Sequence, residues 1–470
     1  MGMEGKYVFT IQVPSMTPFL QYSDRRDLRE KLFTAYFMKG DNDNERDTKD
    51  IIARIAKLRV ERSKLLGYEN YASYVLERNM AKTPEKVFEF LSQIWDAALP
   101  VAKAEAAAQQ ELINREGGKF KLAPWDWWYY TEKIKKEKYD LDDEITRPYF
   151  QVDSVMKGMF YVANRLYGLE FKTRNDIPKY HPDVKTFEVT RNGKHVGVLL
   201  IDNYPRASKR SGAWCGAFRG QYRDAKGKMV TPVVTVVTNS TPPTADKPSL
   251  LTAEEAGTLF HEFGHALHQL LSNSTYPGVS GTSVPRDFVE LPSQIMEHWV
   301  LEPEVLKVYA KHYQTGEVIP QEIVDKLDKA GKFNTGFITV EYLAASLLDM
   351  EYHVLTEPVD LNIREFEKQV LDKYGLIPEI KPRYRSTYFN HIWASGYAAG
   401  YYSYIWCEIL DSDAFEAFKE TGDIFNREIA AKFENEILSK GGTRDPYDMY
   451  LAFRGKEPSI DALLRNRGLK

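Results

Sequence analysis

Apolar residues recur at three- and four-residue spacing over almost the whole of residues 23–115, the spacing of one face of an α-helix. The stretches that carry the pattern are DLREKLFTAYF, TKDIIARIAKLRVERSKLL, YASYVLERNMA and PEKVFEFLSQIWDAALPVAKAEAAAQQELI. The last begins at Thr83-Pro84-Glu85, a capping residue followed by proline at the first helical position. From residue 252 to the end the pattern is again helical. The chain is therefore expected to be mainly α.

Shorter stretches have the character of β-strands. Residues 184–203 (VKTFEVTRNGKHVGVLLIDN) predict a hairpin around Asn192-Gly193. Residues 229–238 (MVTPVVTVVT) predict a further strand. Residues 6–14 (KYVFTIQVP) predict one short strand near the start. The expected architecture is a helical protein with one small β-sheet, at about 184–240, beside the helix that follows it.

Composition excludes several functional classes. A net charge of −4 offers no basic excess to neutralise phosphates, which argues against a nucleic-acid partner. Cys215 and Cys407 are too few for a disulfide framework and are read as reduced thiols. The start has no charged segment followed by an apolar one, and no apolar run approaches the roughly 18 residues of a membrane span. The protein is therefore expected to be cytoplasmic, with no membrane partner.

The segment EAGTLFHEFGHALH contains the pattern H-E-x-x-H. Thr252-Ala-Glu-Glu is a capping-box pattern, so a helix is expected over about 252–272. On that helix His261 and His265 lie one turn apart on one face, the spacing at which two imidazoles reach one metal ion. Glu262 then lies close to the metal without binding it, where it can accept a proton from a water that zinc has made acidic.

The same pattern also occurs by chance in helices that bind no metal, but Gly264 favours a metal site here. Glycine inside a helix costs about 1 kcal/mol relative to alanine, which indicates close packing. His268 is expected beside the site and not as a ligand. Catalytic zinc takes three protein ligands and keeps an open position. Glu290 and Glu297, seven residues apart, are the candidates for the third ligand, and spacing does not choose between them.

Three segments in order, LFHEFGHALHQL, SGTSVPRDFVELPSQ and HIWASGYAAGYYSYIW, resemble the thimet-oligopeptidase-like zinc metallopeptidases, and most of all their peptidyl-dipeptidase (dipeptidyl carboxypeptidase) branch. The likeness extends from LLGYENYASYVLERNMAKTPE to RGKEPSIDALLRNRGL, essentially the whole chain. It implies a zincin-like helical fold with a deep substrate cleft. It also implies one Zn²⁺ with Glu290 as third ligand, because the family's zinc-binding glutamate stands in E-x-x-S after R-D-F-V. Glu297 is then left without a role.

The resemblance assigns further residues. Tyr404 is expected to donate a hydrogen bond to the oxyanion, with His391 assisting and with Tyr397 and Tyr401 binding substrate. Spacings of four and three predict that the tyrosines share one helical stripe. Residues expected to hydrogen-bond the ligand imidazoles are Asp287, Glu254 and Glu255. Residues expected to line the peptide groove or to hold a free C-terminal carboxylate are Arg206, Lys209, Arg210, Arg286, Arg383 and Arg385.

The implied function is hydrolysis of short unstructured peptides with release of C-terminal dipeptides. An oligoendopeptidase of the same family is the alternative, and a shortened, non-catalytic peptide-binding protein is a further one. Residues 1–120 are expected to form part of the cleft wall and 121–470 the catalytic region, with the tyrosine segment at 391–406. Family members carry an additional N-terminal helical segment, so a missing segment or a second polypeptide is expected to complete the substrate channel.

Overall fold

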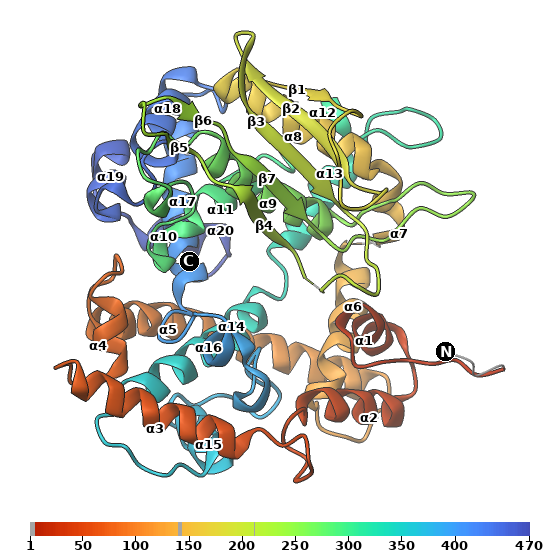
Figure 1. Cartoon of the computed structure of the whole chain (residues 1–470). Helices are drawn as coiled ribbons and strands as arrows, with labels where there is room; N and C mark the ends of the chain where they lie inside the picture. Colours follow the sequence, from red (N-terminus) through yellow and green to blue (C-terminus); the bar gives the residue numbers. More distant parts are fainter. Residues whose placement is uncertain (1–4, 140–142, 211) are drawn as a thin grey trace. The chain divides into compact units, whose positions relative to one another are not determined.

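The structure of the protein is a computed structural model that describes residues 5–139, 143–210 and 212–470 (Figure 1). The chain divides into two compact units, each assembled from separate stretches of sequence. Unit 1 comprises residues 1–140, 329–402 and 464–470, and unit 2 comprises residues 141–328 and 403–463. Among the described residues, every helix is too short or too polar to cross a membrane.

Unit 1 is helical, as the spacing of apolar residues in 23–115 predicts. Its elements are α1 (Val13–Tyr22), α2 (Arg26–Phe37), α3 (Lys49–Leu65), α4 (Tyr71–Leu76), α5 (Pro84–Arg115), η1 (Pro124–Asp126), α6 (Trp127–Tyr139), α14 (Thr335–His353), α15 (Ile363–Lys373), η4 (Ser386–Tyr388) and α16 (Asn390–Ala394). The predicted start of α5 is confirmed, because the Thr83 side chain accepts a hydrogen bond from Lys86 N at 3.3 Å. Helix α14 packs along α5, where Glu105 accepts hydrogen bonds from Gly336 N and Phe337 N.

The strand predicted for residues 6–14 is wrong. The chain is irregular up to residue 12, and α1 begins at Val13. A strand is stabilised by a neighbouring strand, and none of the described residues pairs with this segment. Tyr7 is 96% exposed, so the apolar side chains that suggested a strand have no sheet to cover.

Unit 2 contains the predicted sheet. Among the described residues its strand order is β1 (Leu169–Thr173), β2 (Lys185–Arg191), β3 (Lys194–Asp202), β7 (Val233–Val237) and β4 (Trp214–Arg219); β3 and β7 are parallel and the other neighbours antiparallel. The β2–β3 hairpin is confirmed: Asn192 and Gly193 have φ of 51° and 72°, as a two-residue turn of this kind requires. The stretch 229–238 instead divides at Pro232, which has no N–H for a ladder, into β6 (Met229–Val230) and β7. Strand β6 pairs with β5 (Tyr222–Arg223).

Helices complete unit 2. They are α7 (Asp143–Thr146), η2 (Arg147–Tyr149), α8 (Val152–Tyr167), α9 (Ala253–Leu270), η3 (Pro277–Val279), α10 (Arg286–Val289), α11 (Leu291–Glu297), α12 (Pro303–Tyr309), α17 (Ser403–Lys419), α18 (Arg427–Phe433), the π-helical turn η5 (Glu434–Leu438), η6 (Gly441–Thr443) and α19 (Pro446–Arg454). Helices α13 (Gln321–Gly331) and α20 (Ile460–Asn466) each cross a boundary between the units.

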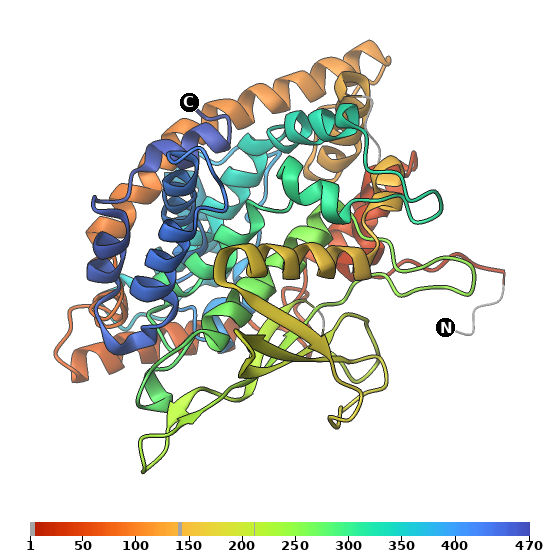
Figure 2. The ribbon, with the colours of Figure 1, turned by 90° about the horizontal axis from the view of Figure 1, so that it is seen from above.

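Aromatic packing fixes α9 against the sheet. Helices α8 and α9 lie along the sheet (Figure 2), and the Phe160 ring of α8 stacks on Phe171 of β1 with centroids 4.2 Å apart. Phe263 of α9 reaches the same cluster, 5.7 Å from Phe171 and 5.9 Å from Phe160. The helix that carries the H-E-x-x-H pattern is therefore braced by the core of unit 2.

Candidate metal centre

Helix α9 begins as its sequence predicts. The Thr252 hydroxyl accepts a hydrogen bond from Glu255 N at 3.0 Å, and Thr252 N donates to the Glu255 carboxylate at 2.8 Å. This reciprocal capping box starts a regular helix that runs to Leu270. His261 and His265 consequently lie one turn apart on the same face.

Gly264 allows α9 to lie directly against the start of α11. A Cβ atom at this position would meet Pro292 O at 2.2 Å and Ser293 Cα at 2.6 Å, closer than any side chain tolerates. The prediction of close packing at Gly264 is therefore confirmed. This contact brings Glu290, which immediately precedes α11, up to the histidine face of α9.

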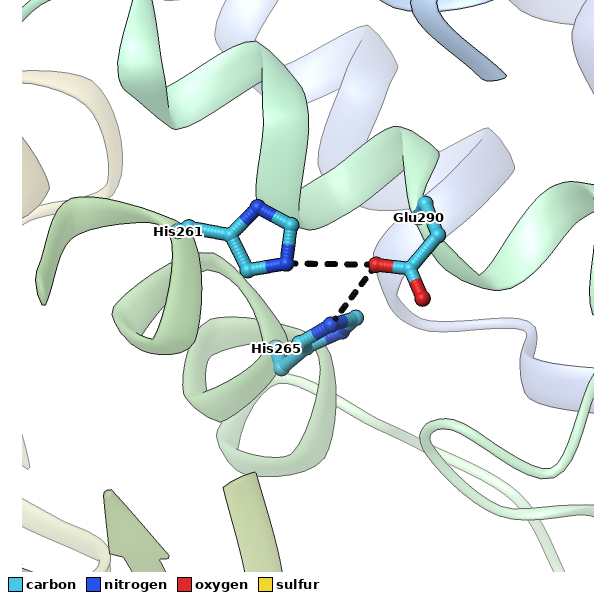
Figure 3. A group of neighbouring side chains, drawn as sticks. All are labelled: His261, His265 and Glu290. Atoms are coloured by element: carbon cyan, nitrogen blue, oxygen red, sulfur yellow. Dashed lines mark ion pairs between the residues drawn. The ribbon is translucent and has the colours of Figure 1, made fainter. Parts of the chain in front are cut away.

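The side chains of His261, His265 and Glu290 converge (Figure 3). Glu290 Oε2 lies 3.2 Å from His261 Nε2 and 3.0 Å from His265 Nε2. Their potential ligand atoms all lie within 4.8 Å of one another, close enough to share one ion. Ser293 Oγ donates to Glu290 Oε2 at 3.0 Å and helps to orient the carboxylate, which is only 4% exposed. Of the two glutamates that spacing left open, Glu290 is the one in this group.

Charge and burial oppose each other in this group. Burial alone would lower the pKa of His261, but hydrogen bonds to Glu290 and Glu297 raise it well above its usual value. Burial alone would raise the pKa of Glu290, but the neighbouring His265 and His261 hold it well below its usual value. The carboxylate therefore stays ionised in a nearly dry site, which suits a ligand for a cation.

Glu297 has a contact that sequence reasoning missed. Its carboxylate lies 2.6 Å from His261 Nδ1, the ring nitrogen that faces away from Glu290. The predicted partners do not fill this position: Glu255 caps α9, Glu254 is exposed, and neither imidazole is hydrogen-bonded to Asp287. The predicted hydrogen bonds of these three residues to the imidazoles are wrong, and Glu297 makes the contact instead. The seven-residue spacing of Glu290 and Glu297 was the signal, because it places both carboxylates on the same side of α11.

Glu262 lies beside the group and is almost fully buried. It is 6% exposed, and its Oε2 has no hydrogen-bond partner among the described residues. Burial raises the pKa of Glu262, while the charges of His261 and His265 act against that rise. A buried carboxylate without a donor is costly unless a further group binds to it. Strand β4 runs nearby, since the charge of Glu262 adds to burial in raising the pKa of the Cys215 thiol.

His268 is not part of this group. The ring is fully buried, and both its nitrogens lack partners within the described chain. Burial, reinforced by the charge of His265, lowers the pKa of His268 to about 3. The ring is therefore neutral and packed inside unit 2.

Tyr404 is anchored close to Glu290 through α11. Gln294 Nε2 donates to Tyr404 O at 3.1 Å, and Gln294 N donates to Glu290 O at 2.9 Å. Tyr404 is the second residue of α17 and is half-buried. The predicted helical stripe of tyrosines is wrong, however, because residue 397 is irregular, residues 398–402 form turns and α17 begins only at Ser403.

The other predicted residues of the tyrosine segment belong to unit 1. The His391 ring lies 5.6 Å from the Tyr397 ring and 5.2 Å from the Tyr401 ring, centroid to centroid. Burial and the charge of Arg383 lower the pKa of His391. Tyr397 is half-buried, whereas Tyr401 is only 3% exposed. Tyr401 therefore packs against the His391 ring, and its contact with substrate stays a prediction.

The basic residues predicted to bind the peptide differ in how exposed their side chains are. The Lys209 side chain is 2% exposed and donates to Asp202, to Tyr204 O and to Thr238 O, and its contact with substrate stays a prediction. Arg206 is partly exposed and makes a two-pronged ion pair with the same Asp202. In unit 1 Arg385 forms ion pairs with Asp41 and Glu367. The Arg383 side chain is 49% exposed, and its guanidinium lies 3.9 Å from Glu341.

Comparison with known proteins agrees with this geometry. A family model described as peptidase family M3 matches residues 19–469. The chain belongs to peptidase family M3. It is 41% identical to the dipeptidyl carboxypeptidase of Escherichia coli (strain K12) over 472 aligned positions, which cover 100% of this chain and 69% of the relative. It is 40% identical to oligopeptidase A of the same organism over 475 aligned positions, which cover 100% of this chain and 70% of the relative.

The protein is therefore an M3 metallopeptidase, and its family implies a divalent metal ion. A carboxypeptidase of Pyrococcus furiosus is a structural neighbour with a TM-score of 0.52 and 14% identity, covering 98% of this chain and 80% of the other. That likeness concerns the fold alone and confirms the expected helical, zincin-like architecture.

Proposed function

We propose that this M3 metallopeptidase uses one Zn²⁺ to hydrolyse short, unstructured peptides and releases dipeptides from their C-termini. The observation that carries the proposal is the convergence of His261, His265 and Glu290 beside the buried Glu262. The 41% identity to a dipeptidyl carboxypeptidase supports the specificity. Oligopeptidase A, at 40% identity, supports internal cleavage as the second candidate.

The donor set suits zinc. Two imidazole nitrogens and one carboxylate oxygen are ligands that catalytic zinc takes while keeping an open position. If His261 Nδ1 carries the proton and donates it to Glu297, then His261 Nε2 presents a lone pair to Glu290 Oε2 at 3.2 Å. Two acceptors at this distance repel each other unless a cation lies between them. Glu297 then orients the His261 ring for that cation, as carboxylates commonly do for zinc-binding histidines.

In the proposed mechanism, His261, His265 and Glu290 hold the ion and Glu262 moves the proton. When bound, zinc supplies Lewis-acid chemistry, polarising the peptide carbonyl and making water more acidic. Glu262 accepts the proton of the attacking water and then donates it to the amine that leaves.

Tyr404 is proposed to donate a hydrogen bond to the oxyanion that forms during cleavage. Its anchoring through Gln294, one turn from Glu290, supports this role. Tyr404→Phe is expected to lower kcat by about a hundredfold to a thousandfold, because one oxyanion donor is lost. Stopped assays with a quenched peptide measure the loss. Tyr447→Phe is the matched control, since it removes an exposed hydroxyl of unit 2 that donates to Glu457 at 2.7 Å; an equal loss in both variants contradicts the role.

In unit 1 we propose that His391 and Tyr397 bind the peptide, with Tyr401 supporting the His391 ring. His391 Nδ1 is buried and has no hydrogen-bond partner within the described residues, a position that a polar group of a ligand would satisfy. Arg383 is the candidate for the C-terminal carboxylate, because it is half-exposed and adjoins the same ring cluster through Tyr384. Arg206 stays a candidate for the peptide groove.

Amidating the C-terminus of a decapeptide separates the two candidate activities. If dipeptides are released through recognition of the carboxylate, amidation is expected to remove most of the activity, because the charge–charge contact is lost. Mass spectrometry of the products measures both the rate and the position of cleavage. Unchanged cleavage of the amidated peptide at internal bonds would establish the oligoendopeptidase instead. Arg383→Gln is expected to slow only the unblocked peptide, which makes the amidated peptide its internal control.

Two predictions from the sequence accompany this proposal. We expect residues 1–120 to form part of the wall of the substrate channel, with the catalytic centre in 121–470. We expect the protein to act in the cytoplasm, which cell fractionation tests.

A further inference from the structure

The segment between α16 and α17 is irregular although it carries side chains assigned to substrate. It runs Ser395-Gly-Tyr-Ala-Ala-Gly400 before Tyr401, and such small residues leave a free backbone many conformations. Ala399 has φ of 51°, the left-handed region that a residue with a Cβ avoids. Something in the fold must therefore hold this segment in place.

Asp349 of α14 holds it directly. This carboxylate is fully buried, and it accepts hydrogen bonds from successive backbone N–H groups of Ala399, Gly400 and Tyr401, each at 2.9 Å. Consecutive N–H groups that converge in this way form a concave anion-binding site, and bonds to an ionised acceptor are the strong ones. From the same helix, the Tyr342 hydroxyl donates to Tyr401 O.

A second contact ties down the other end of the segment. Arg59 of α3 donates through Nη2 to Ile392 O at 2.8 Å, and its Nη1 lies 2.7 Å from His353 Nε2. The guanidinium lies 5.3 Å from the ring centroids of both Tyr71 and Trp393. Its position is therefore fixed by aromatic rings as well as by hydrogen bonds.

These contacts form one chain of hydrogen bonds. A guanidinium only donates, so His353 Nε2 accepts and His353 Nδ1 carries the proton. Nδ1 lies 2.7 Å from Asp349 O and 2.8 Å from Asp349 Oδ1. Arg59, His353 and Asp349 thus connect residue 392 to residues 399–401 through the interior of unit 1.

We propose that Asp349, supported by His353 and Arg59, is a positioning residue for the peptidase reaction. By fixing the backbone of 399–401 it holds the Tyr397 and Tyr401 rings against the His391 ring. The backbone of Tyr397 is also bonded to residues on both sides of it in the sequence. Tyr397 N donates to His391 O, and Gly400 N donates to Tyr397 O, each at 2.9 Å. The inference rests on the proposed function in one respect, namely that His391 and Tyr397 bind peptide.

A role in packing alone does not account for Asp349. Its neighbours on α14, Leu348 and Met350, are fully buried apolar residues, and an apolar residue at 349 would avoid burying a charge. A buried charge is costly unless it is fully hydrogen-bonded, and replacing such groups by apolar ones is often stabilising. The hydrogen bonds that the Asp349 carboxylate accepts from the backbone of the segment that carries Tyr397 account for a charged residue at this position.

Asp349→Asn tests the inference because it keeps the shape and removes the charge. The amide nitrogen must face at least one of the N–H donors, so the segment loosens. We expect KM for a quenched peptide to rise about tenfold to a hundredfold, as loss of a hydrogen bond to a buried charge implies. Values of kcat and zinc content should change little. Hydrogen exchange of the amides of 399–401 should accelerate by a similar factor.

Two further variants make the test specific. Phe337→Leu lies on the same helix but packs on Trp127 of α6, with ring centroids 4.6 Å apart, and should destabilise α14 without changing KM. Ala399→Gly in the Asp349→Asn background removes the strain of the positive φ and should restore KM about fivefold. Unchanged KM and amide exchange in Asp349→Asn, or an equal rise of KM in Phe337→Leu, would overturn the proposal. If the wild type cleaves no peptide, the proposed function fails, and amide exchange alone still decides whether Asp349 holds the segment.

Discussion

Glu262→Gln is expected to abolish peptide hydrolysis while the protein keeps its metal ion. The carboxylate is buried beside His261 and His265, and in the proposed mechanism it is the group that takes a proton from water and returns it to the leaving amine. A glutamine has the same size but no basic oxygen of comparable strength. The loss of a positioned base lowers the rate by about a hundredfold to ten-thousandfold. Turnover of a quenched peptide and the metal content of the same sample give both quantities.

Glu254→Gln is the matched control for this experiment. Glu254 lies on the same helix, in its first turn, but it is exposed and makes no contact with the ligand imidazoles. Its replacement should leave the rate within a factor of about two, as exposed substitutions usually do. Full activity in Glu262→Gln would contradict the assignment of Glu262 as the base. An inactive Glu262→Gln that has lost its metal would contradict it as well, because the missing metal would then explain the inactivity.

Removing the metal should have an equally large effect. Chelation should remove bound zinc and activity together. Glu290→Gln should do the same, because it reduces the three protein ligands to two imidazoles. Added zinc should restore the chelated wild type but not the variant. The metal also stabilises the folded state by binding it preferentially, so the melting temperature should fall with its removal. Activity that persists at full rate without metal would contradict the account.

Glu297→Gln provides an intermediate case. Its carboxylate contacts His261 Nδ1 and lies outside the group of His261, His265 and Glu290, so the variant would keep all three ligands but hold the His261 ring less firmly. Replacing such an outer partner weakens metal binding by about tenfold to a hundredfold. Competition with a chelator of known affinity measures this value. An affinity equal to that of the wild type would show that the 2.6 Å contact does not orient the ring.

Features with a local cause were predicted correctly. Helices α5 and α9 begin at residues whose side chains cap them, and the β2–β3 hairpin turns at Asn192-Gly193. Gly264 inside a helix correctly predicted a close contact, which is the one with Pro292 and Ser293. These signals work because the stabilising groups lie within a few residues of one another, where spacing alone sets the geometry.

Features that depend on distant parts of the chain were missed or wrong. His261 meets Glu297 only because α9 packs on α11, a contact 36 residues away in the sequence. The tyrosine segment has a helical spacing, but Asp349, 50 residues upstream, bonds its backbone N–H groups and holds a turn. Spacing along the chain carries no information about such neighbours.

X-ray absorption at the zinc edge, on the full chain supplied with zinc, tests the central claim most directly. The account predicts one zinc per chain, with scattering from two imidazoles and from oxygen ligands at about 2.0–2.2 Å. Glu290→Gln should remove that signal and Glu262→Gln should retain it. Absence of stoichiometric zinc in the wild type, or a spectrum that Glu290→Gln leaves unchanged, would contradict a metal centre formed by His261, His265 and Glu290.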